Sequence, residues 1–513
     1  MAFVHKERFV FPPRVRSHWP LFAVGALTLV AFALRVYRAG DSLGGFHAFN
    51  EGFYLAQAQG YVERGLASAL LAPGDQNNPP LFSVMVAIAF QVFEPSVVAA
   101  RAVSAAFSAL GTVFVYGLTT ELYEKKAGVM AALAFTLMPG SVLLGHNVQV
   151  DATMVTFSTG AVFLFVRAVR MSSTATAAAA GALLGVGVLT KITAVLALPA
   201  LAVWVAYSER GRIGPAVRRG VAALVAFVAV AAPWYVLRMI SSADEFLASQ
   251  RGLAGTIDPP DLTFLTTYFL IESMWMVSPV LFALFLVFLA SSVSRRGKGD
   301  LLVWLLLFVN VAFYLVYHYH TYYLLTLTPV VAVLTGRTLV DLGVHSWKRV
   351  LVVGVPMAAV LLTLSFATMA ALKYGDSGLD RLDEVLDVTA PDAAVLATSD
   401  LLDNTGPALV FVSRREIGRL ELSSPGGLVD TRPDAVVVDY WDDWGLQMNR
   451  PQLKLPRTGV RAVLFGTAFY ARADWTHGFT LNSLEVESIK GPFAFGIEEY
   501  EAPAAYVIWL PAP

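Results

Sequence analysis

Long apolar segments recur along most of this chain and then stop. From Pro20 to Ala371 the sequence repeatedly contains runs of the roughly 17–25 apolar residues that an α-helix needs to cross a bilayer. Only 15% of the 513 residues are charged, whereas soluble domains are about 25% charged. The chain is therefore predicted to be a polytopic α-helical membrane protein.

Eleven candidate membrane spans follow from these segments. They are residues 20–38, 101–121, 127–145, 152–169, 173–190, 192–208, 220–240, 264–291, 301–317, 322–338 and 350–371. The apolar segment 81–93 is too short for a span and lies between Pro79-Pro80 and Glu94-Pro95. This favours an interfacial or re-entrant helix in the first outer loop.

The basic residues between the spans indicate the orientation. With eleven spans and a cytoplasmic N-terminus, the cytoplasmic side contains Lys125, Lys126, Arg167, Arg170, Arg210, Arg212, Arg218, Arg219, Arg295, Arg296, Lys298, Arg337, Lys348 and Arg349. If residues 81–93 also spanned, all of these would lie outside, against the positive-inside rule. We therefore expect a multi-pass cell-membrane protein whose N-terminus is inside and whose chain after Lys373 is outside.

The residues after the last span have ordinary polarity and predict a second domain. The predicted division is a transmembrane domain over 1–372 and an extracytoplasmic α/β domain over 373–513. Strands are predicted at 393–400, 434–441, near 461–466 and near 504–510, with a helix over 401–412. No glycine-rich phosphate loop follows the first strand, which favours an accessory or acceptor-facing role.

Composition excludes several function classes. The net charge of −1 lacks the basic footprint that binding to a nucleic-acid backbone needs. The absence of cysteine excludes disulfides, cysteine nucleophiles and thiolate metal sites, and the eight histidines show no metal-ligand spacing.

Polar residues at the predicted outer face are the first candidates for chemistry, because a charge beside hydrocarbon is costly unless it pairs or acts. Asn50-Glu51 begins a helical pattern in which Glu51 and Tyr54 share a face, although an ordinary helix-start charge also explains the acid. Arg101 lies at the outer end of the second span, where it either binds phosphate or extends its charge to the interface.

Three later segments add further candidates. Asp151 precedes the fourth span, and capping that helix explains it as well as catalysis does. Lys191 lies between two apolar spans and needs an anion or a water-filled cavity. His320, Tyr322 and Tyr323 lie at an outer helix start, where an aromatic belt explains the tyrosines better than the histidine.

The order of these motifs resembles a known family. Along 20–371 it comprises Asn50-Glu51, Pro79-Pro80-Leu81, Arg101 with Ser104, Asp151, the Leu-Thr-Lys turn ending at Lys191, and Tyr-Tyr-Leu-Leu from Tyr322 followed by Pro329. The set is similar to the protein O-mannosyltransferase and aminoarabinose-transferase-like membrane glycosyltransferases. The resemblance implies the GT-C fold and an outer-face transfer, with inversion, of a sugar from a polyprenyl-phosphate donor to a hydroxyl or amine. The acceptor it implies is a protein, a lipid or a glycan.

Two positions depart from the family pattern. Asn50 stands where the family has an aspartate, and Asn78 stands where it has a lysine that looks like a carrier-phosphate contact. We therefore assign the general base to Glu51 or Asp151, with Glu51 preferred.

The remaining assignments concern the substrate. Lys191, Arg101 and Tyr322 are the phosphate candidates, and the other expected substrate contacts are Tyr323, His320, Asn78 and Tyr54. A Mg²⁺ or Mn²⁺ ion bridging Glu51 and Asp151 suits the oxygen ligands. A transporter or lipid flippase is the rival class, although its polar groups would lie near the midplane. A catalytically inactive scaffold with the GT-C fold is the third reading, and Asn50 is its support.

Overall fold

The structure is a computed structural model of the chain. It describes residues 13–41, 43, 48–68, 79–255, 273, 276–292, 297–316 and 321–372, and in the remaining chain 395–398, 411, 417–420, 435–439, 452–464, 467–471, 486–489 and 495–509.

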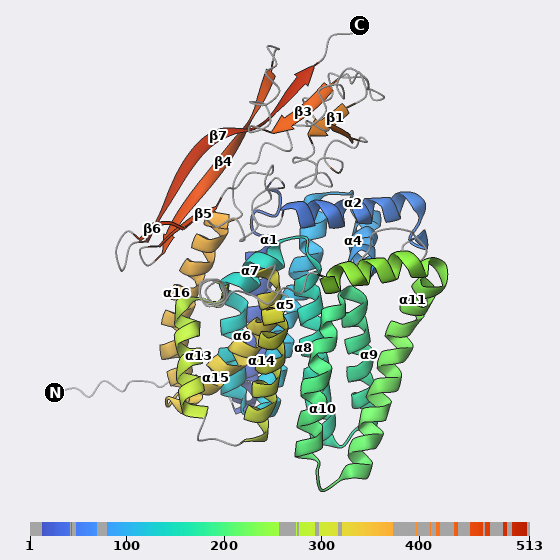
Figure 1. Cartoon of the computed structure of the whole chain (residues 1–513). Coiled ribbons are helices and arrows are strands. Elements are labelled where there is room, and N and C mark those ends of the chain that lie inside the picture. Colours follow the sequence, from blue (N-terminus) through green and yellow to red (C-terminus); the bar gives the residue numbers. More distant parts are fainter. Residues whose placement is uncertain are drawn as a thin grey trace, which may run out of the picture.

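The described part of the chain to residue 372 is helical. In order, the helices are α1 (Pro13–Val36), α2 (Ala48–Arg64), α4 (Leu81–Val92), α5 (Val97–Leu122), α6 (Lys125–Leu137), α7 (Pro139–His146), α8 (Val150–Met171), α9 (Thr174–Thr190), η1 (Ile192–Leu196), α10 (Ala197–Ser208), α11 (Ile213–Gly255), α13 (Pro279–Ser292), α14 (Lys298–Val316), η2 (Thr321–Leu327), α15 (Thr328–Asp341) and α16 (Trp347–Leu372). Most run side by side, whereas α2 lies across one end of the bundle (Figure 1).

Seven described helical segments are long and apolar enough to cross a membrane. They are Trp19–Val36, Val97–Leu122, Val150–Met171, Ile213–Ser241, Lys298–Leu315, Tyr322–Asp341 and Trp347–Ala370. Their exposed faces carry large apolar side chains such as Leu29 and Ile240, as lipid-facing helices do. The polytopic helical membrane fold is therefore confirmed. The described residues do not reach the count of eleven, because α9, the η1–α10 segment and α13 are shorter and the expected span 127–145 is bent. Of the expected span 264–291, residues 264–272, 274 and 275 lie outside the described residues.

The expected span 127–145 is broken. It forms α6 and α7, which meet at Met138 with a bend of 55°. Pro139 begins α7, and proline cannot continue the hydrogen bonding of the preceding helix. The short α4 helix has 12 residues, about 18 Å at the usual helical rise, which agrees with the expectation that segment 81–93 does not span.

The described strands after α16 form one mixed sheet of seven strands in the order β2-β1-β3-β7-β4-β5-β6. The strands are β1 (Val395–Thr398), β2 (Ile417–Leu420), β3 (Ala435–Asp439), β4 (Gln452–Leu464), β5 (Thr467–Ala471), β6 (Val486–Ile489) and β7 (Phe495–Trp509). β1 pairs in parallel with β2 and β3, and the other pairs are antiparallel. β1 and β3 lie inside the first two predicted strand segments. The predicted helix 401–412 lies almost entirely outside the described residues.

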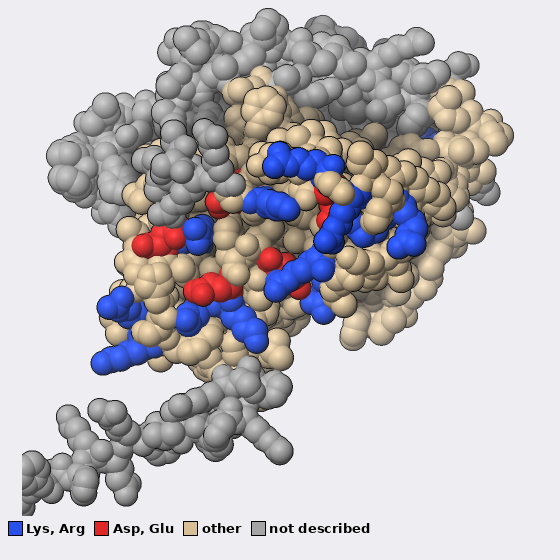
Figure 2. Space-filling view, turned by 90° about the horizontal axis from the view of Figure 1, so that it is seen from below, with Lys and Arg blue, Asp and Glu red and all other residues tan. Residues whose placement is uncertain are grey.

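The end of the bundle opposite α2 gathers basic side chains. Figure 2 views this end directly and shows Lys and Arg side chains spread over it, with fewer acids between them. Arg167, Arg170, Arg210, Lys298 and Arg349 are among the exposed basic residues. This distribution agrees with the asymmetry from which the cytoplasmic end is predicted, and the orientation itself stays a prediction.

Candidate active site

The first candidate carboxylate, Glu51, forms a buried ion pair. Glu51 lies in the first turn of α2 and Arg101 in the first turns of α5, and both side chains are fully buried. The Arg101 Nε donates to Glu51 Oε1 at 3.0 Å, and a terminal nitrogen donates to Oε2 at 3.0 Å. This two-point geometry matches the planar guanidinium to the planar carboxylate and fixes the orientation of the Glu51 side chain.

The rest of the Arg101 guanidinium is also engaged. Its other terminal nitrogen donates to the backbone oxygens of Ala39 and Asp41, at 3.1 and 2.6 Å. These two carbonyls belong to the turn that follows α1. Arg101 therefore ties α2 and the end of α1 to α5.

The second candidate carboxylate forms its own ion pair. Lys191, at the break between α9 and η1, places Nζ 2.9 Å from Asp151 Oδ1. Asp151 is in the first turn of α8, and its other oxygen accepts from Gln149 Nε2 at 3.1 Å. Asp151 and Lys191 are buried, with exposed fractions of 1% and 6%. The anion partner that the sequence required for Lys191 is thus a residue of this chain.

Two aromatic rings cover the same ammonium group. Lys191 Nζ lies 4.3 Å from the ring centre of Tyr322 and 4.7 Å from that of Tyr323, both in η2. The two rings meet edge to face at 4.7 Å. Aromatic faces attract cations, so these tyrosines stabilise the lysine charge in a place with little water. The structure brings together four residues that the sequence analysis had named separately: Asp151, Lys191, Tyr322 and Tyr323.

One short segment joins the two ion pairs. Between α7 and α8, the backbone nitrogen of Val148 donates to Glu51 Oε1 at 2.9 Å. Three residues later the same segment carries Asp151, and Gln149 between them bonds to Asp151. Segment 147–151 therefore fixes the position of one carboxylate relative to the other.

The other predicted residues are placed as follows. Tyr54, one turn after Glu51 on α2, is buried and packs edge to face on Phe82 of α4 at 5.3 Å. Asn50 is partly buried in the first turn of α2, beside Glu51. Asn78 and His320 lie outside the described residues.

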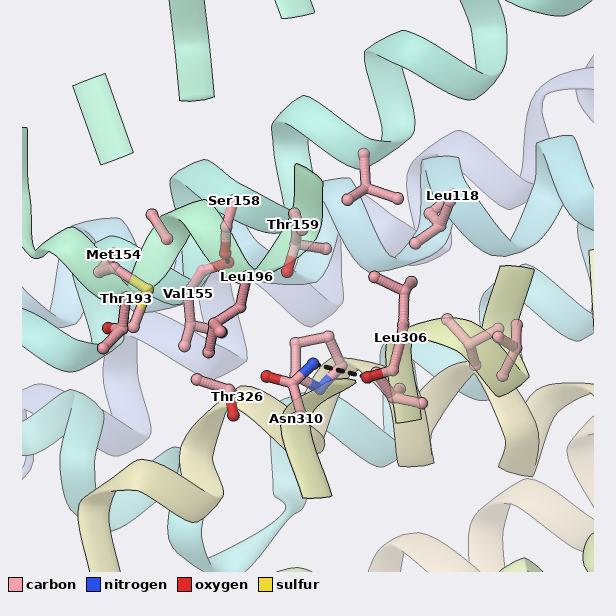
Figure 3. Close-up of a pocket in the computed structure, with 17 residues that line it drawn as sticks. Leu118, Met154, Val155, Ser158, Thr159, Thr193, Leu196, Leu306, Asn310 and Thr326 are labelled. Carbon is pink, nitrogen blue, oxygen red and sulfur yellow. Dashed lines mark hydrogen bonds between the residues drawn. The ribbon is translucent and has the colours of Figure 1, made fainter. Parts of the chain in front are cut away.

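A cavity lies between the helices close to the second ion pair in sequence. Its lining is mostly apolar and includes a few polar side chains. It has a volume of about 50 Å³. Its lining includes Met154 and Val155, three and four residues after Asp151, Thr193, two residues after Lys191, and Thr326, three residues after Tyr323. Figure 3 shows these residues around the same space as Ser158, Thr159 and Asn310, whose amide donates to the backbone oxygen of Leu306 at 2.7 Å. The cavity is therefore bordered by the elements that carry the second ion pair and its aromatic cover.

The metal hypothesis finds no support in the donor set. Glu51 and Asp151 each already face a buried cation, and the described residues contain no group of three His, Cys, Asp or Glu side chains that could hold a metal ion. The described residues therefore do not fit a Mg²⁺ or Mn²⁺ site.

Sequence reasoning missed two contributors to this site. The Val148 contact is made by a backbone amide, which no side-chain pattern can indicate. The sequence prediction does not include Gln149, although this residue stands two positions before Asp151. The polar run GHNVQVD between two apolar helices was the available signal, because amide side chains at membrane depth need partners.

Comparison with known proteins confirms the expected resemblance. Residues 77–236 match the family model described as dolichyl-phosphate-mannose-protein mannosyltransferase. This stretch includes Arg101, Asp151 and Lys191. Among curated proteins, no sequence relative of the chain is found.

Solved structures give the fold. ArnT from Cupriavidus metallidurans, bound to undecaprenyl phosphate, is 15% identical with a TM-score of 0.63, over 86% of this chain and 96% of that one. The oligosaccharyltransferase AglB from Archaeoglobus fulgidus, in complex with an inhibitory peptide and a dolichol-phosphate, is 14% identical with a TM-score of 0.54, over 93% and 76%. The arabinofuranosyltransferase AftD from Mycobacteria is 15% identical with a TM-score of 0.54, over 97% and 40%.

Proposed function

We propose that this chain, whose fold is that of the GT-C membrane glycosyltransferases, transfers a sugar from a polyprenyl-phosphate donor to a hydroxyl or amine acceptor. The observation that carries the proposal is the pair of buried carboxylate–cation contacts, joined by segment 147–151 at one end of an apolar helical body. Burying four charged side chains near hydrocarbon costs desolvation free energy, so a purely structural role explains them poorly. The arrangement favours a site for a charged substrate.

The donor phosphate is assigned to Lys191. Its ammonium is held between Asp151 and the rings of Tyr322 and Tyr323, where low polarity strengthens its field. The adjoining cavity suits the first apolar unit of a polyprenyl chain, because its lining is mostly aliphatic. Binding of a polyprenyl phosphate by ArnT and of a dolichol-phosphate by AglB supports this class of donor.

The reaction then needs one base and one cation. The base takes the proton of the acceptor hydroxyl or amine, whose oxygen or nitrogen attacks the anomeric carbon as the bond from that carbon to the phosphate oxygen breaks. The bonding pair leaves with the polyprenyl phosphate, whose negative charge Lys191 stabilises. Attack opposite the leaving phosphate inverts the anomeric centre.

Glu51 remains the preferred base, with Asp151 as the alternative. Asp151 is the direct partner of Lys191, so protonating it would weaken the hold on the cation that the leaving phosphate needs. Glu51 Oε2 accepts a hydrogen bond from a terminal nitrogen of Arg101. We assign Arg101 to holding Glu51, because its guanidinium already donates to Glu51 and to two carbonyls.

The orientation belongs to the same proposal. We place the site on the outer face, with eleven spans, a cytoplasmic N-terminus, a transmembrane domain over 1–372 and an extracytoplasmic α/β domain over 373–513. The basic residues at the opposite end support this placement. A reporter fused after Pro513 should be active only outside the cytoplasm, and activity only inside would overturn the eleven-span topology.

Sugar transfer in reconstituted vesicles tests the function. We expect radiolabelled sugar to move from polyprenyl-phosphate-sugar to an acceptor with the intact chain and not with a Glu51→Gln variant. Movement of the labelled lipid between leaflets without transfer would indicate a flippase. Neither transfer nor movement would favour the inactive scaffold, for which Asn50 is the motivating observation.

A further inference from the structure

A second buried arginine lies near the site, and neither the sequence motifs nor the proposed mechanism uses it. Arg35 is in the last turn of α1 and is fully buried. Its guanidinium donates to Ser108 Oγ of α5, Ser141 Oγ of α7 and the backbone oxygens of Ala31 and Thr136, at 2.8, 2.8, 2.9 and 3.3 Å. All of these acceptors are neutral.

Within the described part of the chain, Arg35 has only neutral acceptors. A buried guanidinium without an anion is costly, because an uncompensated charge loses its hydration. An aliphatic residue of similar length would pack there at lower cost. Stability alone therefore does not explain why an arginine occupies position 35. The contacts of Arg35 suggest a role in positioning.

The contacts of Arg35 converge on the break between α6 and α7. Thr136 is in the last turn of α6, whose final carbonyls have no partner within the helix, and Arg35 donates to its oxygen. Ser141 is in the first turn of α7. At the other end of α7, a ring nitrogen of His146 contacts the Arg35 backbone oxygen at 2.8 Å. Arg35 thus contacts both ends of α7, the first through its guanidinium at Ser141 and the second through its backbone oxygen at His146.

The packing of α7 on Arg35 leaves no space. A Cβ atom added to Gly145 would lie 2.6 Å from Arg35 Nε and 2.5 Å from Ser108 Oγ, which is closer than real side chains approach. One residue beyond α7 begins the 147–151 segment that joins the two ion pairs.

We propose that Arg35 is a positioning residue, which holds α7 so that segment 147–151 delivers the Val148 amide to Glu51 and Asp151 to Lys191. The link to catalysis rests on the proposed function. The claim that Arg35 holds α7 and segment 147–151 in place does not rest on the proposed function, and it can be measured separately.

The chain contains no cysteine, so Val148→Cys introduces a single thiol at a fully buried position of this segment. We expect Gly145→Ala to raise the rate of maleimide labelling of that thiol about 10-fold, and Arg35→Met to raise it further. The matched control is Arg219→Met, which removes a buried arginine at the opposite end of the molecule. It should leave the rate unchanged. Equal rates in all variants would overturn the proposal.

A second thiol distinguishes positioning from general loosening. Ala180→Cys places it at a buried position of α9, away from α7. Its labelling should not change with Gly145→Ala or Arg35→Met, and an equal rise there would overturn a positioning role.

Turnover supplies the functional arm. The Ser141→Ala variant loses one hydrogen bond from the Arg35 guanidinium and should still fold. The Gly145→Ala variant should displace α7. We expect kcat to fall about 3-fold and at least 10-fold respectively, with the KM for donor unchanged. Unchanged kcat with faster labelling would overturn the catalytic link alone. If the intact chain transfers no sugar, the proposed function fails and labelling still decides the role of Arg35.

An independent observation concerns the opposite end of the molecule. The α10–α11 turn and the start of α14 border an open surface cavity of about 550 Å³, lined by Tyr207, Ser208, Glu209, Arg210, Gly211, Arg212 and Lys298. Arg219 pairs with Glu209 and cancels its charge. Arg210 is held over the Tyr207 ring at 5.2 Å, and Lys298 Nζ donates to the Ser208 oxygen at 2.9 Å. The cavity therefore has a net positive charge.

Exposed apolar side chains stand beside this cavity. Val203 of α10 and Ile213 and Val217 of α11 are 52%, 69% and 56% exposed, at the point where α11 begins its candidate span. Cations beside lipid-facing aliphatic residues match a phospholipid, with its headgroup in the cavity and its chains along the helices. We infer that the cavity binds the headgroup phosphate of an anionic phospholipid.

Spin-labelled phosphatidylglycerol in phosphatidylcholine nanodiscs tests this site. We expect the association constant to fall about fivefold for each charge removed in Arg210→Gln, Arg212→Gln and Lys298→Gln. Arg167→Gln, at the same end but paired with Glu121, is the matched control and should have no effect. An equal fall in the control would indicate only a diffuse basic surface, and displacement by millimolar inorganic phosphate would indicate a soluble ligand. Either result would overturn the lipid site.

Discussion

Helices α5 and α8 carry carboxylate–cation contacts at both of their ends, and the two ends differ completely in environment. At the end near α2, Glu51 meets Arg101 with neither side chain exposed. At the other end, Glu121 of α5 meets Arg167 and Arg170 of α8, whose side chains are 45% and 65% exposed. Water screens the second set and makes it worth little, whereas burial makes the first costly to break. The same residue types therefore indicate a site at one end and a solvated surface at the other.

Breaking the buried pair should have the largest effect. Glu51→Gln removes the proposed base, which should lower the transfer rate about 10²–10⁴-fold. It also leaves Arg101 buried without a carboxylate, which should cost about 3–5 kcal/mol of stability. Transfer assays and thermal unfolding in detergent measure the two losses.

The double variant Glu51→Gln with Arg101→Met separates these effects. Removing both charges should restore most of the stability and none of the activity. Recovery of transfer in the double variant would show that Glu51 only neutralises Arg101 and is not the base.

Lys191→Met should give the next largest effect. Losing one charged hydrogen bond to phosphate is worth roughly 1.5–3 kcal/mol, so donor affinity in nanodiscs should fall about 10- to 150-fold. Because Lys191 is paired with buried Asp151, stability should fall as well, which the sequence alone did not indicate. Adding Asp151→Asn removes the stranded charge. If donor affinity then returned, Lys191 would be a partner of Asp151 only.

The aromatic cover of Lys191 should matter less. Tyr323→Leu removes a ring 4.7 Å from the ammonium and should weaken donor binding by roughly 0.5–2 kcal/mol. Tyr323→Phe keeps the ring and should bind donor nearly as well as the intact chain. Equal losses in the two variants would assign the effect to the hydroxyl group.

Glu121→Gln should have the smallest effect. Its partners are exposed, so stability should change by at most about 1 kcal/mol and the transfer rate should not change. A large loss of transfer would contradict the contrast between the two ends of α5.

The sequence by itself determined the membrane-spanning character, the helical segments and most of the candidate site. Apolar length and charge are local properties, so the long apolar helices, the short α4 helix and the exceptional polar residues can be predicted from the chain, whereas the count of eleven spans and the unbroken span 127–145 were not reproduced. The ordered motifs likewise indicated the resemblance that residues 77–236 confirm. Glu51, Arg101, Asp151 and Lys191 were each identified in this way.

Only the tertiary structure decided how those residues pair. Glu51 and Arg101 are 50 positions apart, and Asp151 and Lys191 are 40 apart, and nothing in either local pattern specifies a partner. The α6–α7 bend, the Val148 amide and the neutral contacts of Arg35 were also hidden, because they depend on backbone groups and on helices distant in sequence. A buried charge is stabilised by whatever the fold brings within about 3 Å, and the fold alone sets that neighbourhood.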